Sequence, residues 1–128
     1  MIDMTGPQPP NTACFGSFAA LYHADLRDVA AAVLWVAYAQ KLGSPVPTSS
    51  MSDIERQLSG AIPEMARVVW GRQPPAAATA RHVLYEAIQV LELNCLLYRT
   101  GGTVEMIRLT RTGRAAILSG EIRAYLVR

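Results

Sequence analysis

The sequence predicts a mainly α (α+β) fold, and three observations carry that prediction. Hydrophobic residues make up 51% of the 128 positions and charged residues 17%, a balance typical of a globular chain rather than a disordered one. Apolar residues recur at helical spacing in several segments, the longest of which spans residues 75–93. Two short apolar stretches then flank a glycine turn, which indicates a β-hairpin. The chain length favours a single domain.

The N-terminal region divides into an arm and a helical segment. Residues 1–16 are rich in proline and glycine and are expected to form a flexible arm, so the single domain would cover 17–128. Residues 17–42 are predicted to be helical, with Asp25 in the first turn of a helix that begins near His23. Apolar side chains surround nearly the whole circumference of this segment. We therefore expect it to be buried on several sides, one of them against a second copy in a homodimer.

Two shorter helices and a turn are expected next. Ser50 or Ser52 can cap a helix whose first turn holds Asp53. A further helix is expected from Pro63 to Gly71, since proline suits a first helical position. The segment 72–75 then reads as a tight turn.

The longest predicted helix, 75–93, leads into the predicted hairpin. Its apolar side chains gather on one face, and Asn94 is expected to close it in a left-handed conformation. Strands are expected at 95–99 and 104–109, joined by the turn at 100–103.

The C-terminal end is predicted to be one more helix. Thr110 can cap it through its hydroxyl, and the helix is expected over 112–127. Cys95, just before the hairpin, is expected to be a small buried apolar residue. Cys14 and Cys95 fit no metal-binding spacing and are expected to be free thiols of a cytoplasmic protein.

Two motifs in this region carry a family resemblance. The helix–strand junction holds Leu91, Glu92, Leu96, Leu97 and Arg99, and the start of the last helix holds Leu109, Thr110, Gly113 and Arg114. These residues resemble the patterns Leu-Glu-x-x-Gly-Leu-hydrophobic-x-Arg and Leu-Thr-x-x-Gly-Arg of winged helix-turn-helix regulators of the MarR and PadR types. The family glycine falls at Cys95, so Asn94 would have to supply the unusual backbone geometry.

The resemblance implies a winged helix-turn-helix with a two-stranded wing and extra N- and C-terminal helices. It also implies a transcriptional regulator that binds double-stranded DNA through helix 75–93 and wing 95–109. In such docking the N-terminal part of one helix reads base edges in the major groove. The candidate DNA-binding residues are Arg72, Gln73, Thr79, Arg81, His82, Tyr85, Arg99 and Arg108. Among them, Arg81 is expected to bond guanine, and Arg99 and Arg108 to reach the flanking phosphates.

Charge is unevenly distributed along the chain. Residues 1–64 hold three basic and six acidic residues, and residues 65–128 hold nine arginines and four glutamates, so the net charges are −3 and +5. The basic half is the half that carries the predicted wing, and positive charge attracts phosphate.

Other interpretations remain open from the sequence. Arg81 and His82 also fit an ordinary solvated helix face. The arginines at 108, 111 and 114 also fit a solvated surface or ion pairs with Glu105 and Glu121. The chain as a whole also fits a winged-helix module for protein interaction or dimerisation that does not bind DNA.

Several function classes find no support in the sequence. No catalytic, nucleotide-binding or metal-binding motif is present, so neither an enzyme nor a metal or cofactor is expected. The longest apolar run, 29–39, is too short to cross a bilayer. No secretory signal precedes it, so a cytoplasmic protein without a membrane partner is expected.

Overall fold

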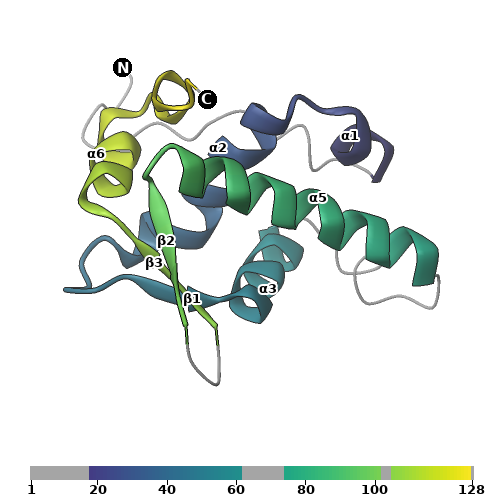
Figure 1. Cartoon of the computed structure of the whole chain (residues 1–128), viewed down its shortest axis with the longest axis horizontal. Coiled ribbons are helices and arrows are strands. Elements are labelled where there is room, and N and C mark those ends of the chain that lie inside the picture. Colours follow the sequence, from purple (N-terminus) through teal and green to yellow (C-terminus); the bar gives the residue numbers. More distant parts are fainter. Residues whose placement is uncertain (1–17, 62–73, 102–104, 128) are drawn as a thin grey trace, which may run out of the picture.

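The structure is a computed structural model that describes residues 18–61, 74–101 and 105–127 (Figure 1). In chain order its elements are α1 (Phe18–His23), α2 (Leu26–Tyr38), η2 (Ala39–Lys41), β1 (Thr48–Ser50), α3 (Met51–Ala61), α5 (Pro74–Leu93), β2 (Leu97–Thr100), β3 (Met106–Leu109), α6 (Arg111–Ser119) and η3 (Ile122–Tyr125). This mainly helical α+β architecture confirms the predicted class. The predicted arm 1–16, the helix 63–71 and residues 72–73 lie outside the described residues.

The predicted helix 17–42 is two helices, because the chain breaks at Ala24 and Asp25. Asp25 is the N-cap of α2 rather than a residue of its first turn. Its backbone is extended, and its side chain accepts a hydrogen bond from the Arg27 amide at 2.9 Å. An aspartate at this position satisfies an amide that a helix start leaves unpaired, so it begins a new helix instead of continuing the first.

α2 is the central helix of the core. Eight of its thirteen residues are buried, and it packs against α3, α5, α6 and η3. In Figure 1 it runs behind α5, and α6 lies to the left of both helices. Most of the apolar circumference that suggested a second subunit is therefore covered by the chain's own elements, while Trp35 and Val36 are half-buried.

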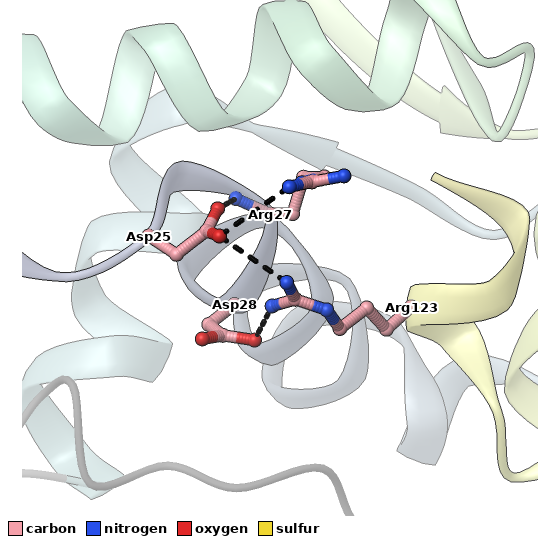
Figure 2. Close-up of polar contacts among 4 residues, drawn as sticks. All are labelled: Asp25, Arg27, Asp28 and Arg123. Carbon is pink, nitrogen blue, oxygen red and sulfur yellow. Dashed lines mark hydrogen bonds and ion pairs between the residues drawn. The ribbon is translucent and has the colours of Figure 1, made fainter. Parts of the chain in front are cut away.

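η3 is also joined to the start of α2 by ion pairs. Figure 2 shows Arg123 reaching both Asp25, the N-cap of α2, and Asp28 in its first turn. Its Nη2 lies 3.2 Å from Asp25 Oδ2, and its Nη1 pairs with Asp28. Carboxylates at a helix N-terminus stabilise the helix dipole, and Arg123 fastens the C-terminal segment to them.

α3 begins at a reciprocal cap. The Ser50 hydroxyl accepts from the Asp53 amide at 3.1 Å, and the Asp53 carboxylate accepts from the Ser50 amide at 3.2 Å. This arrangement pairs two amides at the helix start, and it selects Ser50 over Ser52 as the cap. Ile54 and Leu58 on the inner side of α3 are fully buried.

The sheet has three strands in the order β1-β3-β2, all antiparallel. The sequence analysis missed β1, a strand of only three residues that pairs Ser49 with Ile107. Behind this pair, the Tyr38 hydroxyl donates to the Ile107 carbonyl at 2.7 Å. Burial raises the pKa of Tyr38 to about 12. The sheet is thus tied to the end of α2.

The junction between α5 and β2 differs from the prediction, and β2 begins at Leu97 instead of residue 95 because Cys95 and Leu96 belong to the turn that ends α5. Cys95, not Asn94, has the left-handed backbone, with a φ of 62°, and Cys95 is exposed rather than buried. Asn94 instead uses its side chain: Nδ2 donates to Val90 O at 2.8 Å, and Oδ1 accepts from the Val127 amide at 3.1 Å. Cys95 thus takes the conformation usual for glycine, at the position where the family pattern has one.

The last helix is shorter than the predicted 112–127. α6 ends at Ser119 because Gly120 adopts a left-handed conformation, with a φ of 74°, and caps it. The chain then forms η3, from which Ile122 and Leu126 return to the core.

Candidate nucleic-acid interface

The motif Leu-Thr-x-x-Gly-Arg, at residues 109–114, joins α6 to the end of α5. The Thr110 hydroxyl donates to the Cys95 carbonyl at 2.6 Å and accepts from the Gly113 amide at 2.9 Å. The Thr110 amide donates to Leu96 O at 3.1 Å. Thr110 is therefore both the cap of α6, as predicted, and a link to the α5–β2 junction.

Arg114 completes the motif by binding main-chain carbonyls. Its guanidinium donates to Leu42 O at 2.8 Å and to Ser44 O at 3.1 Å, in the loop that follows η2. Neither Glu105 nor Glu121, which the sequence offered as partners of this arginine group, is the residue that it binds. Thr110, Gly113 and Arg114 thus make contacts within the chain that stabilise the fold, and these contacts account for the motif without a ligand.

The exposed side of α5 forms one continuous stripe. Leu84, Ala87, Ile88 and Leu91 face the core and are fully buried. The opposite side presents His82, Tyr85, Glu86 and Gln89, all exposed. The His82 side chain is 80% exposed and lies 3.8 Å from Glu86 one turn later. Two predicted residues, His82 and Tyr85, therefore lie on one accessible helix face.

Arg81 lies at the edge of that stripe, beside α3. Its Nε is 3.6 Å from Glu55 Oε1, and its side chain is 48% exposed while that of Glu55 is 11% exposed. Burial raises the pKa of the Glu55 carboxyl, and the positive charge of Arg81 opposes that rise. Arg81 is accessible to a ligand, but it already has a carboxylate partner.

The two wing arginines lie on opposite faces of the sheet. Arg99 is opposite Ile107 in the register, and Arg108 is opposite Tyr98, one position along. Successive residues of a strand point to opposite faces, so Arg99 shares the inner face with buried Ile107. Arg108 shares the outer face with Tyr98, which is 44% exposed.

Arg99 is held between two glutamates. Its Nε lies 3.5 Å from Glu92 Oε1 at the end of α5, and its Nη1 lies 3.4 Å from Glu105 Oε1 just before β3. Arg99 and Glu105 also line a small recess with Tyr85, so the structure brings Tyr85 and Arg99 together. The sequence analysis missed Glu92 and Glu105 as partners of Arg99, because Glu92 reaches it through the turn between α5 and β2 and Glu105 through the β2–β3 register.

Arg108 has a different environment. Its Nε is buried and makes no hydrogen bond. Within the described ranges, no carboxylate lies at ion-pair distance from its guanidinium. Arg108 is therefore the predicted wing residue whose charge is least compensated.

The other predicted residues fall in less completely described parts. The main chain of Thr79 belongs to α5, but its side chain lies outside the described residues, as do Arg72 and Gln73.

A separate hollow of about 580 Å³ lies where the end of α2 faces α3. It is lined by Trp35, Val36, Ala39, Gln40, Asp53, Arg56 and Gln57. Of the predicted DNA-binding residues whose side chains the structure describes, none lines it.

In the part of the chain that the structure describes, no group of three or more histidine, cysteine, aspartate or glutamate residues is placed to hold a metal ion. No helix of the same residues has the length and apolar character needed to cross a bilayer.

In comparisons with known proteins, no family model, no curated protein and no solved structure matches the chain.

Proposed function

We propose that this chain is a winged helix-turn-helix protein that binds duplex DNA as a cytoplasmic, non-catalytic regulator. The order of the strands carries the proposal. β1 comes directly before α3, β2 comes directly after α5, and β3 lies between them in the sheet. The β2–β3 hairpin thus follows α5 and pairs through β3 with the strand that precedes α3, which supports its identification as a wing. The sequence resemblance to winged helix-turn-helix regulators, carried by the motif residues of the helix–strand junction and of the start of α6, supports the same proposal.

α5 is the recognition helix of this proposal. Its twenty residues give a length of about 30 Å, and a single helix fits the major groove of B-DNA, which is about 12 Å wide. His82, Tyr85 and Gln89 are on the exposed stripe and would face base edges. Arg81 beside the stripe would bond guanine or phosphate, and Arg108 on the wing would bind the flanking backbone.

The proposed regulator acts as a homodimer, since two copies can place two recognition helices one DNA turn apart. Within 17–42, the dimer surface would use α1 and the half-buried side of α2 around Trp35 and Val36, because the rest of α2 is covered by its own chain. Tyr22 on α1 is 55% exposed. Sedimentation at micromolar concentration should show a dimer, and a Tyr22→Ser variant should shift the population toward monomer. A wild-type monomer under these conditions would remove the dimer from the proposal.

A titration of mixed-sequence duplex DNA tests the proposed activity. Binding at about 50 mM salt that weakens steeply by about 200 mM is expected of a protein that contacts phosphates. Selection from a random duplex library should then enrich one sequence class. No binding at the lower salt, with circular dichroism showing an intact fold, would overturn the proposal.

One observation favours a second candidate, a protein-interaction module. Leu93 and Val127 are 57% and 80% exposed, and the Asn94–Val127 hydrogen bond holds their two segments together. Exposed apolar side chains that lie close together are typical of a contact surface. If DNA binding is absent while Leu93→Ser disrupts self-association, this candidate replaces the first.

A further inference from the structure

The charge around Arg99 has a consequence for how the proposed DNA face works. Arg99 carries one positive charge, and its two glutamate partners carry two negative ones, so this cluster is net negative. A phosphate that approaches Arg99 therefore meets repulsion from Glu92 and Glu105 as well as attraction. Arg99 therefore attracts phosphate less strongly than an unpaired arginine would, although it lies in the half of the chain with the positive net charge.

The contacts that hold Arg99 are long and leave donors available. The guanidinium has five N–H donors, yet the contacts to the two glutamates measure 3.4 and 3.5 Å. Charge-assisted hydrogen bonds of this kind are usually about 2.7–2.9 Å long. The Nε makes no hydrogen bond although it is buried. The Glu105 side chain is 56% exposed, so it can move away from Arg99 at little cost.

We infer that Glu92 and Glu105 are built-in competitors of DNA phosphate at Arg99. They hold the guanidinium in the free protein and suppress its contribution to sequence-independent binding, so that stable binding depends on the α5 stripe. Arg99 exchanges Glu105 for a phosphate only when a duplex is already positioned on α5. This inference rests on the proposed DNA-binding function and names the residues that set its specificity.

The Glu105→Gln variant tests the inference. It removes one competing charge and keeps the shape of the side chain. Binding to mixed-sequence duplex at about 50 mM salt should become about 3- to 10-fold tighter, because one additional phosphate contact releases about one counterion. For the same reason, the slope of log affinity against log salt should steepen by about 0.9. Glu92→Gln should act in the same direction.

Glu121→Gln is the matched control. Glu121 is exposed at the start of η3, makes no ion pair with Arg99, and its substitution changes the net charge by the same amount. It should shift affinity much less than Glu105→Gln does. Adding Arg99→Gln to Glu105→Gln should abolish the gain, while thermal unfolding verifies that each variant is folded.

The outcomes distinguish the competitor role of Glu92 and Glu105 from the DNA-binding function on which it rests. Wild-type binding with equal effects of Glu105→Gln and Glu121→Gln, or with no effect of either, overturns the competitor role and leaves DNA binding intact. A gain that persists without Arg99 also overturns it. No binding by the wild type or any glutamine variant at low salt overturns the DNA-binding function itself, and the competitor role with it.

Discussion

Gly113 lies directly against the main chain of Leu96. A β-carbon added at Gly113 would overlap the Leu96 carbonyl oxygen and crowd the Leu109 side chain. The start of α6 can therefore approach the α5–β2 junction only if this position has no side chain. The close approach lets Thr110 bond both Cys95 and Gly113.

Gly113→Ala is expected to destabilise the protein by about 3 kcal/mol, since the backbone of Leu96 cannot move aside as a flexible side chain can. Urea unfolding monitored by circular dichroism measures the change. Ala115→Ser, on the exposed side of the same helix, should change the free energy of unfolding by no more than about 0.5 kcal/mol. An unchanged urea midpoint for Gly113→Ala would contradict the close approach.

Arg114→Met should cost about 1–3 kcal/mol of stability, because it leaves the carbonyls of Leu42 and Ser44 without their donor. Arg111→Met is the matched control, as Arg111 is exposed one turn earlier on α6 and should be near neutral. Equal unfolding midpoints for the two variants would show that the carbonyl contacts do not stabilise the fold.

Tyr38→Phe removes the hydroxyl that donates to the Ile107 carbonyl, and about 1–2 kcal/mol of stability should be lost near neutral pH. The pKa of Tyr38 is raised from 10 to about 12 in the folded protein. Its stabilising contribution is therefore complete below pH 10 and is lost as the pH rises through the folded value. The difference in unfolding free energy between wild type and variant should shrink from pH 10 upward. A difference that stays constant to pH 12 would refute the raised pKa.

Arg123→Gln should lower the unfolding temperature slightly, and the effect should fade with added salt, because the ion pairs with Asp25 and Asp28 are exposed. The pKa of Asp25 is held below its ordinary value of 3.8, first by the Arg27 amide and then by Arg123. The stability from this carboxylate is present above pH 3.8 and is lost as the pH falls through the folded value. The wild-type advantage should thus vanish in acid, and an advantage that persists there would point to packing instead of charge.

Arg81→Ala should weaken binding to a selected duplex by about 1–3 kcal/mol if Arg81 reads a base. Fluorescence anisotropy measures this, with Arg27→Ala as the control, since Arg27 lies at the start of α2 and carries the same charge. If both variants bind as the wild type does, Arg81 is not part of the site.

Much of the fold could be predicted because local signals determine it. The apolar face of α5, the serine cap of α3 and the threonine cap of α6 depend on residues close in sequence, and each is present. The break at Asp25 was missed because apolar residues on both sides continue the helical pattern across it. β1 was missed because three polar residues form a strand only when β3 lies beside them.

The candidate site could be predicted only in part. Exposure of His82 and Tyr85 follows from the helical period of α5, so the stripe could be derived. The partners of Arg81 and Arg99 could not, because Glu55 reaches Arg81 through helix packing and Glu105 reaches Arg99 across the turn. Arg99 and Arg108 also fall on opposite faces, which only the strand register reveals.

The hydrogen bonds of Thr110 connect the start of α6 to the C-terminal end of α5. Thr110 bonds the main chain of Cys95 and Leu96 on one side and caps α6 on the other. Because Gly113 has no side chain, α6 packs directly against the main chain of Leu96. A displacement of α6 would therefore have to break these hydrogen bonds or move the end of α5 with it.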